Sequence, residues 1–285
     1  MQVVTTVAEM QALATAARCG GARLALVPTM GALHAGHLAL VREARERADH
    51  VTVSVFVNPT QFGPGEDFDR YPRTFEADVD MLRDSGFADV VFAPPVDEIY
   101  PTGASSTVQV QGLDRHLCGA VRPGHFSGVT TVVARLFLAS RPDVALFGRK
   151  DAQQFVILQR MTRDLGFGIE VVGVETVREE DGLALSSRNR YLGPEARRQA
   201  TALYRAVRQA RLAAEAGERD PRVLVEAMQE TIRQAPAGRL QYAEIVDAET
   251  LAPPAILAPG QSAIAAVAVF FDGARLIDNQ FFTVG

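Results

Sequence analysis

The sequence contains few of the residues that build metal centres and disulfide frameworks. Its 285 residues include two cysteines, five histidines and no tryptophan. Cys19 and Cys118 lie in no CxxC pair and in no cluster with histidine, so we expect no zinc site. Two isolated cysteines are typical of a reducing compartment, where they remain thiols.

Long apolar runs, a basic leader and a strong net charge are also missing. The longest apolar stretches, such as residues 263–271, are far shorter than the roughly 20 residues needed to span a bilayer. The N-terminus shows no basic segment followed by a long apolar one, so we expect no signal peptide. A formal net charge of -5 is too small to indicate nucleic acid or a membrane surface as a partner. We therefore expect a soluble, cytoplasmic protein that binds small molecules.

Residues 24–172 alternate short apolar runs with helical patterns. The run at 51–57 is largely β-branched, which is typical of a strand buried on both faces. This alternation predicts a parallel sheet with helices on both faces, in which ligands bind beyond the carboxyl ends of the strands. We expect an α/β fold with a Rossmann-like doubly wound parallel sheet. Its predicted strands are residues 24–27, 51–57, 89–92, 143–147 and 169–172, and its predicted helices include 74–84, 127–138 and 151–164.

The pattern changes after about residue 177. Two helical stretches, 194–216 and 221–234, each begin with a proline, which suits the first turn of a helix. Strand-like runs follow, and Asp272-Gly273 between the last two is a strong hairpin signal. We expect a smaller α+β domain at 177–285, following a larger domain at 1–176. Its predicted strands are 240–246, 263–271 and 274–283.

The segment PTMGALHAGH, residues 28–37, connects the first predicted strand to a helix. His34 and His37 are spaced i, i+3, so their rings share one face of the first helical turn. A helix N-terminus favours anions because its N–H groups are unpaired and its dipole is positive there. One histidine here would more simply be a surface or capping residue, but the pair indicates a phosphate site. The motif resembles the HIGH motif of the nucleotidylyltransferase superfamily, whose members transfer an adenylyl group from ATP.

Further segments narrow this resemblance to one family. They are FVNPTQF at 56–62, RPGHF at 122–126, FGRKDAQQ at 147–154 and REEDGLALSSRN at 178–189. Together with PTMGALHAGH they resemble the pantothenate synthetase (pantoate–β-alanine ligase) family along the whole chain. The resemblance implies that the pantoate carboxylate attacks ATP to give pantoyl-adenylate and pyrophosphate, and that β-alanine then displaces AMP. It also implies that residues 1–176 bind nucleotide and pantoate, and that a homodimer forms through this N-terminal domain.

The resemblance also implies how ATP is held. Its phosphates would contact both histidines, a lysine and a Ser-Ser-Arg run that corresponds to a KMSKS-type loop. Alone, that run would more simply be a solvated linker, but its place between the two predicted domains favours a closing lid that excludes water. The phosphate and catalytic residues are then His34, His37, Lys150, Ser186, Ser187 and Arg188. The other nucleotide contacts are Met30, Gly148, Asp151 on the ribose, with helix capping as its alternative, and Val177 at the adenine.

Pantoate is small, branched and hydroxylated, so its site should be apolar with a few amide hydrogen bonds. Gln61 and Gln154 offer both a donor and an acceptor and are the predicted pantoate ligands. Asn58 and Arg122 also match the family's active-site pattern. The predicted apolar wall consists of Met30, Val132, Val133, Leu136 and Phe147, for which core packing is an equally simple explanation.

Two positions depart from the family pattern. Arg149 stands where a glutamate is common, and Ala152 where an aromatic residue is common. Arg149 reverses a charge beside the predicted phosphate lysine, and either strengthens anion binding or points outward. No acidic residue is an evident metal ligand, so Mg²⁺ is expected to arrive with ATP. Asp78 and Asp80 are conceivable contacts, but a solvated helix face explains them more simply.

Other classes explain less of the sequence. A different HIGH-type enzyme, which transfers a nucleotidyl group to a phosphorylated substrate, would leave NPTQF and the pair Gln153 and Gln154 without a role. A non-catalytic nucleotide-binding module would be expected to have lost a phosphate residue, yet His34, His37 and Lys150 are all present. A nucleic-acid reader fits neither the net charge nor the moderate aromatic content.

The Arg149-Lys150 pair gives a first test. Lys150→Ala should slow adenylate formation by roughly a hundredfold, because it removes a charge that stabilises the transition state. Arg149→Glu should have a mild effect on the same pyrophosphate-release assay. Equal damage from both variants would show that the wrong side chain has been assigned to the phosphates.

Overall fold

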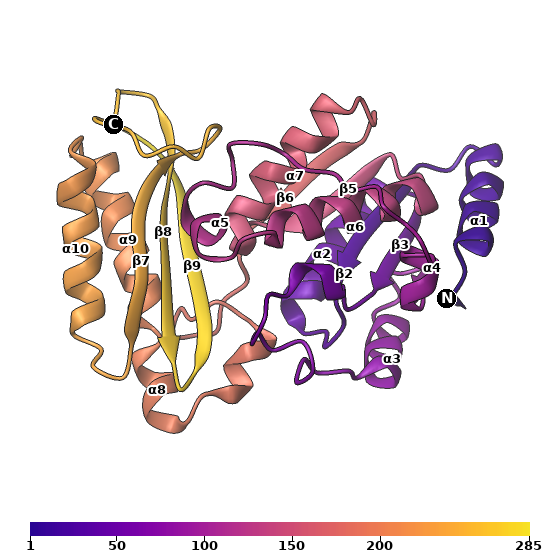
Figure 1. The fold of residues 1–285 in the computed structure, drawn as a ribbon, viewed down its shortest axis with the longest axis horizontal. Coiled ribbons are helices and arrows are strands. Elements are labelled where there is room, and N and C mark those ends of the chain that lie inside the picture. Colours follow the sequence, from indigo (N-terminus) through magenta and orange to yellow (C-terminus); the bar gives the residue numbers. More distant parts are fainter. The chain divides into compact units, whose positions relative to one another are not determined.

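The computed structural model describes residues 1–285, and the chain divides into two compact units (Figure 1). The first unit comprises Met1–Gly112, Val121–Arg149 and Ile157–Glu175. The second unit comprises Leu113–Ala120, Lys150–Val156 and Thr176–Gly285. Lys150, Asp151 and Gln154 therefore belong to the second unit, although they precede its main segment in the sequence.

A six-stranded parallel sheet forms the centre of the first unit. Its strand order is β1-β4-β3-β2-β5-β6, and every neighbouring pair is parallel. This confirms the predicted doubly wound α/β class; β1, which pairs with β4 at one edge, was not expected. The strands are β1 (Gln2–Val4), β2 (Leu24–Thr29), β3 (His50–Val55), β4 (Val90–Phe92), β5 (Val144–Gly148) and β6 (Glu170–Val174).

Helices cover both faces of this sheet. Side chains alternate along each strand, and those of Ala25 and Val27 join one apolar cluster with residues of α2 and α3. Helices α1 and α6 contact each other and also contact β2. The helices of the first unit are α1 (Val7–Cys19), α2 (Ala35–Arg47), α3 (Phe75–Ser85), α4 (Val96–Ile99) and α6 (His125–Ser140), with the 3-10 turn η1 (Pro59–Gln61). Most of α5 (Leu117–Val121) and of the 3-10 turn η2 (Arg149–Asp151), and the start of α7 (Ala152–Asp164), belong to the second unit.

The strand order reverses between β2 and β5. From β2 the chain proceeds through β3 to β4 on one side, whereas β5 and β6 lie on the other. The two central strands, β2 and β5, pair directly, with Ala25 opposite Val144 and Leu26 opposite Ala145. Ligands of doubly wound sheets bind at such a switch point, beyond the carboxyl ends of the strands. The sheet therefore presents Met30, which follows β2, and Gly148, which ends β5, at its ligand-binding edge.

The second unit contains an antiparallel three-stranded sheet in the order β7-β8-β9, which confirms the predicted α+β module. The hairpin signal is also confirmed, because Asp272 and Gly273 both have positive φ angles (48° and 79°) and connect β8 to β9. The helix predicted at 194–216 is instead two helices. The elements are η3 (Ser187–Tyr191), α8 (Pro194–Gln199), α9 (Ala202–Glu215), α10 (Pro221–Arg233), β7 (Arg239–Asp247), β8 (Ser262–Phe271) and β9 (Ala274–Thr283).

Helix α9 packs on the second unit's sheet through small residues. Ala206, Ala210 and Ala214 recur at i, i+4 and are fully buried. Alternate residues of β8, including Val267 and Val269, belong to the same apolar cluster. Because alanine side chains are short, the helix backbone approaches the sheet closely, and the core forms without large side chains from α9.

A close backbone contact in the first unit sets the position of η1. A Cβ atom added at Gly128 in α6 would lie 2.3 Å from the Thr60 carbonyl oxygen and 2.8 Å from the Gln61 nitrogen. The Gly128 carbonyl also accepts a hydrogen bond from Asn58 Nδ2 (3.2 Å). Only glycine permits this approach, so α6 fixes the turn that carries Gln61.

Gly128→Ala should therefore destabilise the fold by about 1–3 kcal/mol, the usual cost of an overpacked buried site. Urea denaturation would measure the change. Gly148→Ala is the matched control, because its added Cβ would meet no atom within 4 Å and its φ is not positive. Equal stability of the two variants would contradict the proposed steric role of Gly128.

Candidate active site

The loop between β2 and α2 orients the two predicted phosphate histidines. His34 is the N-cap of α2, and its Nδ1 accepts a hydrogen bond from the Gly36 N–H (3.1 Å). His37 Nδ1 accepts from the His34 N–H (3.3 Å), and the two ring centroids lie 4.1 Å apart. A neutral imidazole that accepts at Nδ1 carries its proton on Nε2. The main chain therefore makes Nε2 the hydrogen-bond donor of both rings.

A buried carboxylate, Asp78 of α3, holds this loop. Its two oxygens accept hydrogen bonds from the backbone N–H groups of Ala32 (2.9 Å) and Leu33 (2.8 Å). Gly31 and Ala32 have positive φ angles of 77° and 50°, a conformation that costs free energy for alanine. A Cβ at Gly31 would lie 3.0 Å from Asp78 Oδ2. The carboxylate therefore stabilises an otherwise unfavourable turn just before His34.

The expectation of a solvated helix face is wrong for Asp78, whose exposed fraction is 2%. Asp80 does lie at the surface, where it pairs with Arg83 (2.5 Å). Residues two apart point in different directions on a helix. The signal in the sequence was the spacing of Asp78 and the buried Leu82 at i, i+4, which places the acidic residue on the apolar face of α3.

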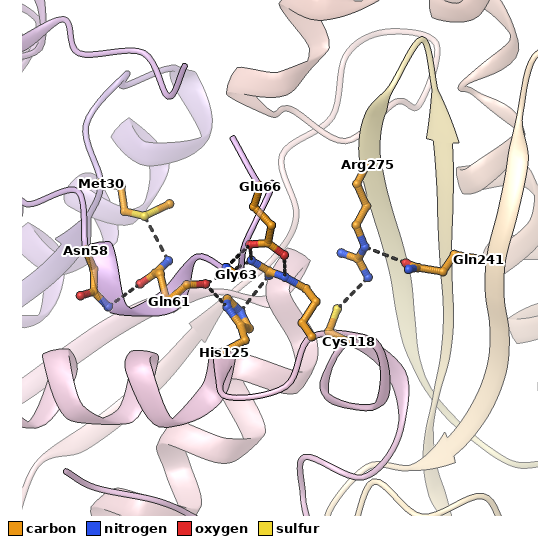
Figure 2. Close-up of polar contacts among 10 residues, drawn as sticks. Met30, Asn58, Gln61, Gly63, Glu66, Cys118, His125, Gln241 and Arg275 are labelled. Atoms are coloured by element: carbon orange, nitrogen blue, oxygen red, sulfur yellow. Dashed lines mark hydrogen bonds and ion pairs between the residues drawn. The ribbon is translucent and has the colours of Figure 1, made fainter. Parts of the chain in front are cut away.

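The side chain of Asn58 is hydrogen-bonded to the side chain of Gln61 (Figure 2). Asn58 Nδ2 donates to Gln61 Oε1 (3.0 Å), and Gln61 Nε2 points to the Met30 sulfur (3.1 Å). The structure thus brings together three predicted substrate residues. Asn58 is 1% exposed, and its Oδ1 accepts from Tyr100 Oη (2.8 Å) and Thr60 Oγ1 (2.9 Å). Protein groups occupy both ends of this amide, so in this structure Asn58 orients Gln61.

Tyr100 supports this arrangement as a donor. Burial raises the pKa of its phenol above the ordinary value, although the hydrogen bond with Thr60, the charge of Arg135 and the hydrogen bond to Asn58 each act to lower it. The phenol therefore stays protonated around neutral pH and keeps donating to Asn58.

Arg122 and His125 hold the main chain of Gln61 from the other side (Figure 2). Arg122 Nη2 (3.2 Å) and His125 Nδ1 (2.7 Å) both donate to the Gln61 carbonyl oxygen. Arg122 also forms a two-point ion pair with Glu66 (2.6 and 2.5 Å). Burial opposes ionisation of Glu66, but the hydrogen bonds and charge of Arg122 outweigh it and hold the pKa of Glu66 below its usual value. Glu66 and His125 were not among the predicted site residues.

The predicted apolar wall divides into two kinds of residue. Four of them are at most 5% exposed and belong to the core, which agrees with core packing as their alternative explanation: Val132, Val133, Leu136 and Phe147. Met30 is only partly buried. Among these five residues, Met30 is the one whose side chain contacts Gln61, a predicted pantoate ligand.

In the second unit, Lys150 and Asp151 lie in η2. The Lys150 Nζ is 4.0 Å from Asp151 Oδ1, a weak pairing between partly exposed groups. Asp151 is the last residue of η2 and directly precedes α7. The neighbouring Gln153 is buried and donates to the carbonyl oxygens of Leu113 (2.8 Å) and His116 (2.9 Å), whereas Gln154 is partly exposed.

The segment from Val177 to Arg188 forms a small hairpin followed by η3. Leu185 N–H donates to the Val177 carbonyl (3.0 Å), and Arg178 pairs with Ala184 in an antiparallel bridge. Ser186 caps η3, with its Oγ accepting from the Arg188 N–H (3.3 Å). Ser187 is buried, and Arg188 is partly exposed. The predicted phosphate run therefore forms a turn capped by the Ser186 side chain.

The two departures from the family pattern have simple structural settings. Arg149 Nη1 forms an ion pair with Glu175 (2.5 Å), at the end of the neighbouring strand β6. Ala152 is 5% exposed at the start of α7. The positive charge of Arg149, at the position where the family commonly has a glutamate, is therefore paired with Glu175 within the first unit.

Neither cysteine forms a disulfide. Cys19 is exposed, and Cys118 is buried in the second unit, where Arg275 donates to its sulfur (3.3 Å; Figure 2). The structure contains no group of three or more His, Cys, Asp or Glu residues arranged to hold a metal ion. None of its helices has both the length and the apolar character needed to cross a membrane.

The Asp78 contacts give a sharp test. In Asp78→Asn the amide nitrogen would face a backbone N–H, so one donor loses its partner at a cost of about 1–3 kcal/mol. The histidine pair would also shift, so pyrophosphate release should slow by at least roughly tenfold. Thermal denaturation and the release assay would measure both effects. Asp80→Asn is the matched control and should be near neutral; similar losses in both variants would contradict the role of Asp78.

Comparisons with known proteins identify the family of the chain. The family model described as Pantoate-beta-alanine ligase matches residues 2–281. The pantothenate synthetase of Salinibacter ruber is 60% identical over 291 residues, which cover 100% of this chain and 98% of that protein.

Two solved structures are similar over nearly the whole chain. The crystal structure of pantothenate synthetase from Thermus thermophilus has a TM-score of 0.90 and 52% identity, covering 98% of this chain and 99% of its own. The pantoate-beta-alanine ligase from Francisella tularensis, solved in complex with beta-gamma ATP and beta-alanine, has a TM-score of 0.80 and 29% identity, covering 98% and 97%. The chain therefore belongs to the pantoate–β-alanine ligase family.

Proposed function

We propose that the chain joins pantoate to β-alanine in two steps, through a pantoyl-adenylate intermediate. Family membership gives the ligase activity and its place in pantothenate biosynthesis, with ATP as a substrate. The observation that carries the adenylate step is the His34–His37 pair, whose Nδ1 atoms are both held by the main chain. Two donors fixed at a helix N-terminus suit the phosphates of a nucleotide.

In the first step a pantoate carboxylate oxygen attacks the α-phosphorus of ATP, and the bond to the pyrophosphate oxygen breaks. Negative charge builds on the phosphates, so preorganised donors and cations stabilise the transition state. We assign this role to the Nε2–H groups of His34 and His37, the ammonium of Lys150 and the run Ser186, Ser187 and Arg188. Lys150 acts as a flexible point charge, whereas Arg188 offers a planar fork of donors.

In the second step the β-alanine amine attacks the acyl carbon, and the bond to AMP breaks. The amine loses its proton to solvent or to the departing phosphate, because no side chain has an evident role as a general base. Exclusion of water matters here, since water would otherwise hydrolyse the adenylate.

Pantoate is assigned to the amides of Gln61 and Gln154, with Met30 contributing apolar surface. Asn58 and Arg122 act on this site through Gln61: the former holds its side chain and the latter its carbonyl. The remaining nucleotide contacts are assigned to Gly148, Asp151 on the ribose and the backbone of Val177.

Mg²⁺ fits this scheme as part of the nucleotide substrate, held by phosphate oxygens and water. Both oxygens of Asp78 already accept backbone hydrogen bonds. Asp80 lies at the surface beside Arg83. These settings support a metal that enters with ATP rather than one held by a protein cluster.

The proposal includes the larger organisation of the enzyme. We assign residues 1–176 to nucleotide and pantoate binding, residues 177–285 to a lid domain, and the working form to a cytoplasmic homodimer. Two-fold dimers are the commonest oligomers of soluble proteins.

Product analysis with pantoate, ATP and Mg²⁺, with and without β-alanine, tests the reaction. Pyrophosphate should appear with pantoate alone, and AMP plus pantothenate should appear once β-alanine is added. Lys150→Ala serves as the control for phosphate-dependent chemistry. Formation of ADP, or turnover only with another acceptor, would mean that the enzyme shares the superfamily motif but not this reaction.

A further inference from the structure

Strand β9 carries two adjacent buried polar residues, Asp278 and Asn279. Their exposed fractions are 2% and 6%. Successive side chains on a strand point to opposite faces, so the two residues reach different neighbours within the second unit. Buried polar side chains are costly unless hydrogen-bonded. Asp278 pairs with Arg178, in the hairpin that leads to Ser186, and Asn279 is bonded to the backbone of Lys150.

Asp278 holds the hairpin that precedes the Ser186–Arg188 run. Its two oxygens accept from Arg178 Nη1 (2.7 Å) and Nη2 (2.9 Å), a two-point ion pair with geometric specificity. Arg178 Nη1 also donates to the Gly182 carbonyl (3.0 Å) at the hairpin turn. The guanidinium carbon of Arg178 lies 4.1 Å from the Tyr204 ring centroid, so a cation–π contact also holds the arginine.

The turn itself fits against the same tyrosine. Gly182 has φ 93°, and a Cβ added there would lie 2.3 Å from Tyr204 Cδ1. The hairpin is closed by Leu185 N–H to the Val177 carbonyl (3.0 Å). Ser186 follows Leu185 directly, so an anchored hairpin fixes the start of the phosphate run.

Asn279 holds the main chain at the phosphate lysine. Its Nδ2 donates to the Lys150 carbonyl oxygen (2.7 Å). The lysine side chain is long and flexible, so the position of its ammonium depends on where its backbone is held. Asn279 therefore fixes the backbone position from which the Lys150 side chain extends.

We infer that Asp278 and Asn279 are positioning residues for the ATP phosphates, one acting through Arg178 on the Ser186–Arg188 run and the other through the Lys150 backbone. This inference rests on the proposed function of those phosphate residues. Because both residues lie on one strand, β9 sets the spacing between the two groups of phosphate ligands in the second unit.

The half-reactions separate positioning from a purely structural role. Formation of pyrophosphate needs the β- and γ-phosphates of ATP, whereas transfer from preformed pantoyl-adenylate to β-alanine does not. Asn279→Ala should raise KM for ATP by roughly tenfold and slow pyrophosphate release, as expected when a hydrogen bond that orients a ligand is lost. KM for pantoate and the transfer half-reaction should stay within about twofold of the parent enzyme.

Removal of Asp278 alone would leave a partly buried arginine without its carboxylate partner and risks unfolding. The double variant Arg178→Met with Asp278→Leu replaces the pair by apolar groups, an exchange that often preserves stability. It should retain a Tm close to that of the parent yet show the same selective loss of the ATP step. Gln261→Ala is the control, because it removes side-chain hydrogen bonds with Asp247 (2.9 Å) and with the Ala258 N–H (2.9 Å) in the same unit, neither of which involves the hairpin or Lys150; both half-reactions should be unchanged.

Two results would overturn the inference. One is an equal fall of both half-reactions in Asn279→Ala together with a lowered Tm, which indicates a structural role only. The other is full ATP-step activity in the double variant. A parent enzyme that releases no pyrophosphate with pantoate would instead refute the proposed function, and the two failures are thereby distinguished.

Discussion

The carboxylate of Asp78 fixes the loop after β2, where the ATP phosphates are proposed to bind. It satisfies two backbone N–H groups of a turn with positive φ angles at Gly31 and Ala32, which would otherwise be unfavourable. That turn sets where α2 begins, and the start of α2 sets the orientation of His34 and His37. A buried charge is tolerated here because hydrogen bonds compensate its loss of water. The strand order alone would place a loop at this edge but would not determine its conformation.

Main-chain groups are held by side chains throughout the candidate site. Arg122 and His125 hold the carbonyl of Gln61, Asn279 holds that of Lys150, and Asp78 holds the N–H groups before His34. Each supporting residue is buried or partly buried and sits on a helix or strand, or directly beside one. The side chains proposed to bind ligands lie on short loops and are thereby held by the elements behind them, which is what electrostatic catalysis requires.

The sequence predicts the fold class well because its signals are local. Alternating apolar runs identified the parallel strands, and Asp272-Gly273 identified the β8–β9 hairpin. The residues that hold the site's backbone were missed because their contacts join positions far apart in the sequence. Glu66 meets Arg122 across 56 positions and Asp278 meets Arg178 across 100, and no local pattern reports such pairs. Asp78 had a local signal, its place on the apolar face of α3, but an acidic residue is usually assigned to the surface. The assignments of site residues to substrates remain predictions.

His34 combines two duties in one ring, since Nδ1 caps α2 and Nε2 is left as the donor. Histidine is not among the preferred residues for starting a helix; serine, threonine, aspartate and asparagine do so better. Selection for thermal stability alone would therefore favour replacement of His34 and would remove one imidazole from the proposed phosphate site. If His34 binds the phosphates as proposed, the protein keeps a suboptimal helix start for the sake of its chemistry, and stability and activity have opposite optima at this position.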